Sequence, residues 1–78
     1  MDKIEKFLKK LILRDKERIL QVTVRILCND LDNLDIKKLK GIKDVYRVRV
    51  GDFRIVFKIE IEYNTIIEIY RRDDRTYK

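Results

Sequence analysis

The chain has 78 residues, of which 20 are Lys or Arg and 14 are Asp or Glu, with one Cys and no His, Pro or Trp. This length allows one small domain, and we expect residues 1–78 to form it. At 45% hydrophobic and 44% charged residues, the chain is too apolar to be disordered and has no apolar run long enough to span a membrane. We therefore expect a soluble, highly charged globule with no membrane partner.

The missing histidines and the single cysteine, Cys28, exclude several kinds of site. Zinc sites and activated serine or cysteine nucleophiles depend on these residue types, so we expect no metal and no cofactor. A lone cysteine and the absence of a signal-peptide pattern indicate a reducing compartment, and the cytoplasm is the default. Any catalysis would come from Arg, Lys, Tyr and carboxylates, which suit the stabilisation of an anionic transition state.

The formal net charge of +6 is unevenly distributed along the chain. Residues 1–36 carry 8 basic and 7 acidic side chains, whereas residues 37–78 carry 12 and 7. A basic surface attracts phosphate backbones, acidic proteins or anionic lipid, and the charge alone does not choose among them.

Apolar residues at spacings of three and four predict an amphipathic helix from Ile4 to Ile12. A second helix is predicted from Asp15, as its N-cap, to about Asn29. Cys28, near its end, is expected to be a buried small hydrophobe. Residues 29–34 mix turn formers with leucines, and the lysine-rich run 37–40 is predicted to be a solvated connector, with a phosphate contact as the alternative.

After Gly41 the apolar period changes to about 2, and strands are predicted at 45–50, 53–61 and 66–71. The expected fold is therefore α+β, a two-helix hairpin followed by a three-stranded antiparallel meander, with the helices on one face of the sheet. The predicted core positions of the last two strands are Phe53, Ile55, Phe57, Ile59, Ile61, Ile67 and Ile69.

Alternation places a second set of residues on the opposite face of the sheet. Two interpretations of this face remain open. It can be a solvated surface whose charges pair across strands with Glu60 or Glu68. It can also bind phosphate, because the planar fork of arginine suits bidentate phosphate contacts. The residues concerned are Arg47, Arg49, Arg54, Lys58, Tyr70 and Arg72.

Two segments resemble the signature of the RelE/ParE toxin superfamily. One is Leu39-Lys40-Gly41, and the other runs from Tyr46-Arg47-Val48-Arg49 through Gly51-Asp52-Phe53-Arg54 to Phe57. The basic C-terminal segment that closes with Tyr77 is also similar, so the resemblance covers roughly residues 4–78. It implies a RelE-like fold, here expected without the usual N-terminal strand and hence one strand short.

The resemblance further implies a toxin of a type II toxin-antitoxin system, with a cognate antitoxin and mRNA on the ribosome as partners. Ribonuclease members cut the mRNA without a metal, by attack of a ribose 2′-hydroxyl on the adjacent phosphate. Arg54 takes the place of the phosphate clamp, and Tyr77 that of an aromatic residue that stacks on the base. The implied catalytic positions are Arg47, Arg49, Arg54, Arg71, Arg72 and Tyr77. The sheet face and the lysine run add Lys40, Lys58 and Tyr70 as RNA-binding candidates.

Two departures from the family pattern keep other functions open. Positions 47 and 49 are lysines in the best-known ribonuclease members, and an arginine is a much poorer general base. Asp73 and Asp74 place two anions near the expected phosphate site. The alternatives are a gyrase-inhibiting or catalytically degenerate ParE-like toxin, and a non-catalytic RNA-binding module.

Overall fold

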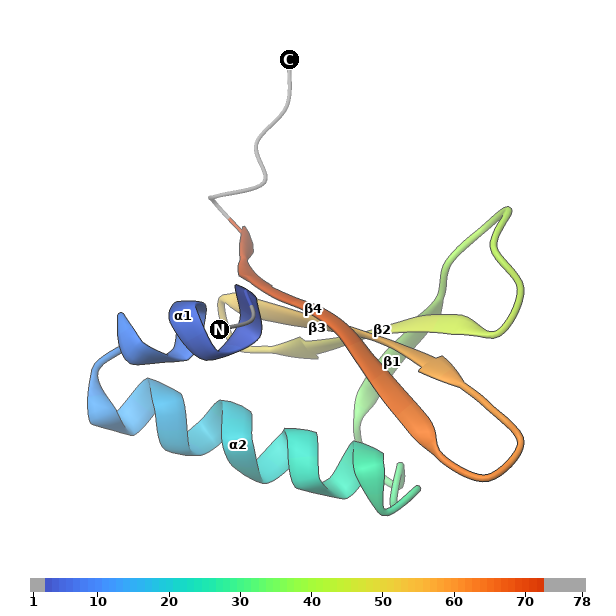
Figure 1. The fold of residues 1–78 in the computed structure, drawn as a ribbon, viewed down its shortest axis with the longest axis horizontal. Coiled ribbons are helices and arrows are strands. Elements are labelled where there is room, and N and C mark those ends of the chain that lie inside the picture. Colours follow the sequence, from blue (N-terminus) through green and yellow to red (C-terminus); the bar gives the residue numbers. More distant parts are fainter. Residues whose placement is uncertain (1–2, 73–78) are drawn as a thin grey trace.

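The computed structural model describes residues 3–72, which form two helices and a four-stranded antiparallel sheet (Figure 1). The strands lie side by side in the order of the chain, which confirms the predicted α+β meander after a pair of helices. The elements are α1 (Lys3–Lys9), α2 (Leu13–Leu27), β1 (Asp35–Lys38), β2 (Val45–Val50), β3 (Phe53–Ile59) and β4 (Asn64–Arg71).

Strand β1 corrects the predicted number of strands from three to four. It lies partly in the run predicted to be a connector, and it pairs with β2 from Asp35 opposite Arg49 to Lys38 opposite Tyr46. The strand has one apolar residue, Ile36, which is too little for a period of 2 to be recognised. It forms because β2 offers it backbone partners and because Ile36 packs against the core.

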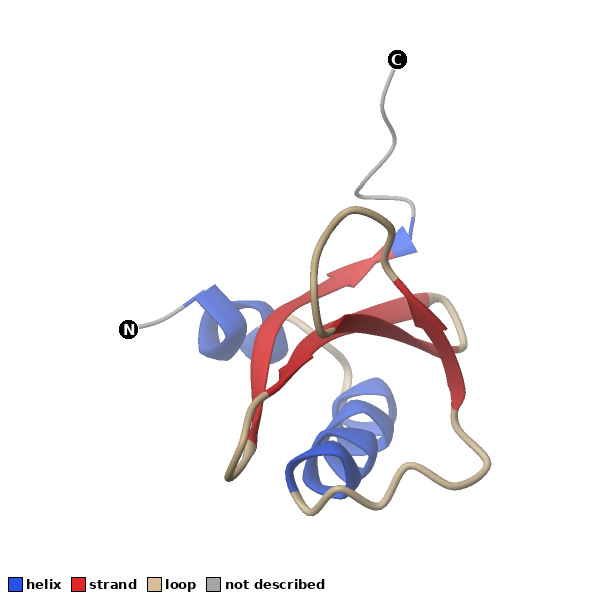
Figure 2. Ribbon diagram, turned by 90° about the vertical axis from the view of Figure 1, so that its right-hand side faces the viewer, coloured by secondary structure: helices blue, strands red, loops and turns tan. Residues whose placement is uncertain are grey.

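Both helices cover the same face of the sheet, and no helix lies on the other face within residues 3–72 (Figure 2). Helix α1 packs against β4, and α2 packs against β2, β3 and β4. Asp15 is not the N-cap of α2, which is Ile12; it lies in the first turn, where its carboxylate still faces the positive end of the helix dipole. Across the described part of the chain, neither helix is both long and apolar enough to cross a membrane.

The main core lies between α2 and the two central strands. Ile19 and Ile26 of α2 are fully buried against Ile55 and Phe57 of β3 and their neighbours, as predicted. The ring of Phe57 also stacks on Tyr46 of β2, with 5.8 Å between the ring centroids. Phe57 is the largest fully buried side chain of this core.

Three predicted burials are wrong. Ile61 is fully exposed because β3 ends at Ile59 and the next residues form a turn, closed by a hydrogen bond from the Glu60 N–H to the Tyr63 carbonyl. Ile67 is 48% exposed because the register of β4 against β3 shifts at a β-bulge beside it. Cys28 is exposed because it caps the end of α2, beyond the helix face that meets the sheet.

One buried polar side chain joins the end of α2 to the start of β4. Asn64 is 6% exposed, and its Nδ2 donates to the backbone carbonyl of Ile26 at 2.8 Å and to Oδ1 of Asn29 at 3.2 Å. The two segments are 38 and 35 residues apart along the chain. Asn64 therefore fixes where the last strand starts relative to the helix.

Gly51 shapes the turn between β2 and β3. Its φ of 58° lies in the left-handed region, which favours glycine. A Cβ at this position would also lie 2.6 Å from Nη2 of Arg18 on α2. The turn brings Phe53 opposite Val50, and the residue that follows, Arg54, starts the outward-facing set of β3.

Candidate functional site

The sheet face opposite the helices, here called the basic face, carries its side chains in rows that cross the strands. Residues paired directly across strands point to the same side of a sheet. One row consists of Asp35, Arg49, Arg54 and Tyr70, from β1 to β4. The next row consists of Lys37, Arg47, Val56 and Glu68.

Two neighbouring hollows lie on the basic face. One, of about 400 Å³, is lined by Arg47, Arg49, Arg54, Tyr70 and Arg72. The other, of about 240 Å³, shares the first three of these arginines and is completed by Asp35 and Lys37 from β1. We call the two hollows together the arginine site. Its residues come from all four strands and the residue after β4, so the sheet itself builds it.

Positively charged side chains of the arginine site occupy directly paired positions on neighbouring strands. Arg49 lies directly opposite Arg54, and Lys37 lies directly opposite Arg47. Like charges at directly paired positions destabilise a sheet. The lining of the two hollows holds one carboxylate, that of Asp35, against four arginines and Lys37. A bound anion would offset the repulsion.

Arg54 is held in place by the β2–β3 turn. Its Nη1 donates to the carbonyl of Phe53 at 3.0 Å and to that of Gly51 at 3.3 Å. The guanidinium has five N–H donors in a planar fork, and those on its other nitrogens make no hydrogen bond to residues 3–72. Such a group is pre-organised to receive the oxygens of a phosphate.

The structure separates the two C-terminal arginine candidates. Arg72 lines the arginine site, and its backbone N–H donates to the carbonyl of Asp52 at 2.7 Å. Arg71 pairs with Phe53 and lies on the helix side, where its guanidinium carbon is 4.7 Å from the centre of the Phe53 ring. Arg71 is therefore not part of the arginine site. Tyr77 lies outside the described residues.

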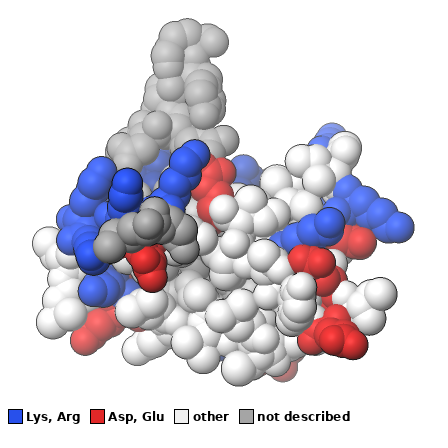
Figure 3. All heavy atoms as spheres, in the orientation of Figure 1, with Lys and Arg blue, Asp and Glu red and all other residues white. Residues whose placement is uncertain are grey.

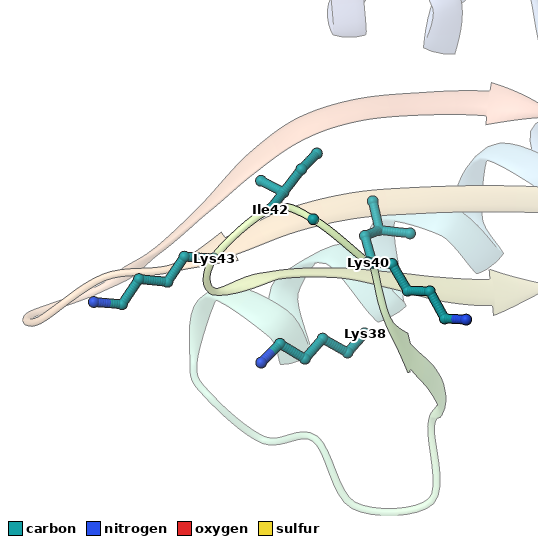
Figure 4. A pocket seen from close by; sticks show the side chains of 6 residues that line it. Lys38, Lys40, Ile42 and Lys43 are labelled. Carbon is teal, nitrogen blue, oxygen red and sulfur yellow. The ribbon is translucent and has the colours of Figure 1, made fainter.

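The two lysine candidates lie away from the arginine site. Lys58 is exposed on the same face, paired with Val45 and Thr65 one row further along the sheet. Lys40 belongs to the β1–β2 loop, which forms a separate hollow of about 520 Å³ lined by residues 38–43. The side chain of Lys40 extends away from those of Lys38 and Lys43 (Figure 4). The structure thus does not bring either lysine to the arginines.

Asp35 and Lys37 were missed as candidate site residues because β1 was not predicted. The signal that could have found them is the short alternation Asp35-Ile36-Lys37, in which one apolar residue separates two charges. No group of three or more possible metal ligands gathers anywhere in the part of the chain that the structure describes. The groups that line the arginine site are five cations, the phenol of Tyr70 and the carboxylate of Asp35.

No family model matches the chain. Toxin RelE3 of Methanocaldococcus jannaschii is 56% identical to it over 39 residues, which are 50% of this chain and 41% of that protein. The match thus spans less than half of the length of this relative. A chain in the crystal structure of the RelB-RelE antitoxin-toxin complex from Methanococcus jannaschii has a TM-score of 0.73 and 27% sequence identity, over 88% of this chain and 84% of that chain. The structural similarity covers both helices and the sheet, and the two findings together support a RelE-like toxin superfamily for this chain.

Proposed function

We propose that this chain is a toxin that cleaves mRNA on the ribosome in the cytoplasm and is neutralised by a cognate antitoxin. The arginine site is the observation that carries the proposal. Four arginines line one open hollow beside Tyr70. Arg49 and Arg54 are direct partners across β2 and β3, so the hollow favours the binding of an anion. An RNA phosphate supplies that charge, and the size of the hollow is suited to a nucleotide.

The proposed reaction is a metal-free transesterification. The ribose 2′-oxygen attacks the adjacent phosphorus, the bond to the 5′-oxygen breaks, and the products carry a 2′,3′-cyclic phosphate and a 5′-hydroxyl. Negative charge increases on the phosphoryl oxygens in the transition state, so cations held beforehand in position lower the barrier. We assign Arg54 as the phosphate clamp, with Arg47, Arg49 and Arg72 as further cations.

The remaining candidates have supporting roles in this proposal. Tyr70 stands in the row of Arg49 and Arg54 and positions the nucleotide. Tyr77, which lies outside the described residues, stacks on a base. Lys40 and Lys58 lie beyond the arginine site, near the end of the sheet where β2 begins, and contact the RNA backbone outside the site. Arg71 stabilises the fold through its contact with Phe53.

Two surfaces support an antitoxin as the protein partner. The basic face suits an acidic segment, which would both neutralise the arginines and block RNA. Helix α2 also carries apolar side chains that the core does not use, in a stripe of Leu13, Leu20, Val24 and Leu27, which are 38–68% exposed. In the view of Figure 3, uncharged residues cover much of the surface in the region of α2. An amphipathic partner helix would bury such a stripe.

Cleavage of mRNA on programmed ribosomes tests the proposal. Primer extension should locate a cut with the wild-type protein, and a single 2′-deoxy substitution at the scissile nucleotide should abolish it. Arg54→Ala should lower the single-turnover rate about 100-fold or more, since a preorganised electrostatic contact is removed, while ribosome association changes far less. Arg14→Ala, on the exposed side of α2, is the matched control and should cleave at the wild-type rate.

The outcomes separate the proposal from its alternatives. Equal cleavage by wild type and Arg54→Ala would remove Arg54 from the mechanism. An absence of cleavage, with gyrase rather than translation inhibited on expression, would indicate a ParE-like toxin. RNA binding without cleavage and without toxicity would indicate a non-catalytic RNA-binding module.

A further inference from the structure

The proposed reaction requires a group that accepts the proton of the 2′-hydroxyl, and the arginines do not provide one. Arginine side chains stay protonated in proteins, and lysine and tyrosine side chains ordinarily keep their proton near neutral pH. The seven residues that line the arginine site comprise four arginines, one lysine, one tyrosine and one aspartate. Asp35 is therefore the one lining residue with a carboxyl group, the remaining type of side chain in the site that can take up a proton.

The sheet places Asp35 beside the groups that would hold the phosphate. Asp35 is the first residue of β1 and pairs directly with Arg49, which in turn pairs with Arg54. It lines the same hollow as Arg47, Arg49 and Arg54, and it is exposed, so that a substrate can reach its carboxylate. A ribose 2′-hydroxyl and the phosphate that it attacks are bonded to adjacent carbons of one ribose, so their binding groups have to be neighbours. The two hollows provide this arrangement.

A carboxylate in a phosphate-binding site also carries a penalty, because it repels the phosphate. A purely structural Asp35 would be expected to neutralise Arg49 through an ion pair. No ion pair between them is formed among residues 3–72, although the two residues are direct partners in the sheet. The carboxylate is thus left open on the surface that the proposed substrate covers.

We propose that Asp35 is the general base of the cleavage reaction, an inference that rests on the function proposed above. Its carboxylate takes the proton of the 2′-hydroxyl as the bond from the 2′-oxygen to phosphorus forms. The electron pair of the breaking bond leaves with the 5′-oxygen, which takes a proton from water, and the hydroxide so formed recovers the proton from Asp35. The charged groups that face Asp35 are Lys37 on β1, Arg47 and Arg49 on β2, and Arg54 on β3.

The test is single-turnover cleavage on programmed ribosomes at neutral pH, with Asp35→Asn, Asp35→Glu and the control Asp32→Asn. Asp35→Asn should lower the rate about 10²- to 10⁴-fold, the usual contribution of a general base. It should bind ribosomes as tightly as wild type or more tightly, because a negative charge is removed from a phosphate site. Asp35→Glu should retain a substantial rate, and Asp32→Asn, in the loop before β1, should behave as wild type.

The results distinguish this inference from the proposed function. Wild-type cleavage with an unchanged rate in Asp35→Asn would overturn the role of Asp35 and leave the endonuclease in place. A slow Asp35→Asn whose melting temperature and ribosome affinity both fall would make Asp35 a structural residue. An absence of cleavage by the wild type as well would refute the endonuclease and the base together.

Discussion

Replacing Asn64, the first residue of β4, with alanine should lower the free energy of unfolding more than a substitution at the end of a turn usually does. The substitution removes two hydrogen bonds, of 2.8 and 3.2 Å, made by a side chain that is only 6% exposed. Each bond contributes about 0.5–1.5 kcal/mol, so the free energy of unfolding should fall by about 1–3 kcal/mol. The carbonyl of Ile26 keeps a bond from the N–H of Asn29, which limits the loss.

For a chain of 78 residues the entropy of unfolding is about 0.16 kcal/mol/K, so this loss corresponds to a fall of about 6–18 °C in the melting temperature. Thermal and urea unfolding followed by circular dichroism would measure it. The matched control is Thr65→Ala, which removes an exposed hydrogen bond to Glu60 and should change the free energy of unfolding by less than about 0.5 kcal/mol. An equal and small effect of both substitutions would refute the view that Asn64 joins α2 to β4.

The nearly isosteric Asn64→Asp gives a second measurement. A carboxylate would face the Ile26 carbonyl with no proton to donate, whereas the protonated acid can donate one hydrogen bond. Burial and this bond favour the protonated form, so the pKa of the introduced group should be higher in the folded protein than in the unfolded one. The folded state then binds more protons, and the stability of this variant should rise as the pH falls toward the ordinary aspartate range. A stability gap to wild type that stays constant with pH would contradict this geometry.

Four further outcomes are expected. Phe57→Ala should lower the free energy of unfolding by about 3–5 kcal/mol in denaturant titrations, because it empties the centre of the core, and a loss below about 1 kcal/mol would contradict the assigned faces of β3. Gly51→Ala should cost about 1–2 kcal/mol through its left-handed φ, measured in the same titrations. Sulfate should raise the melting temperature of wild type and of Arg14→Ala more than that of Arg54→Ala, and equal shifts would show that the ion binds elsewhere. Affinity for the cognate antitoxin should fall as ionic strength rises, and a constant affinity in calorimetry would exclude the basic face as its main contact.

The sequence predicted the helices and the three longer strands because their apolar periods extend over enough residues to be recognised. It also predicted which face of β2 and β3 carries Arg47, Arg49 and Arg54, since alternation follows from the pleat. Strand β1 has too few residues for such a pattern, and its pairing is a tertiary effect. Asp35 and Lys37 were missed for the same reason.

Other differences arise where a local irregularity changes the direction of the chain. The β-bulge in β4 moves Ile67 toward solvent, and the alternation of apolar and polar residues in this strand does not predict the bulge. The separation of Arg71 from Arg72 is different, because adjacent residues of a strand must point to opposite faces once the register is known. The resemblance implied both as catalytic positions, and the pairing of Arg71 with Phe53 places Arg71 on the helix side of the sheet.

Strand β1 lies at the edge of the sheet, so the part of the arginine site that it contributes is held less firmly than the part on β2 and β3. Strands β2 and β3 have neighbours on both sides, whereas the four residues of β1 have one neighbour and a single apolar anchor, Ile36. Detachment of β1 would remove Asp35 and leave the three shared arginines where they are. A strand from another protein could then pair with the exposed edge of β2. In that state the arginines would still bind phosphate, but Asp35 would no longer be in place to accept a proton. Binding of RNA and its cleavage would thus be separable by strand exchange at a single edge.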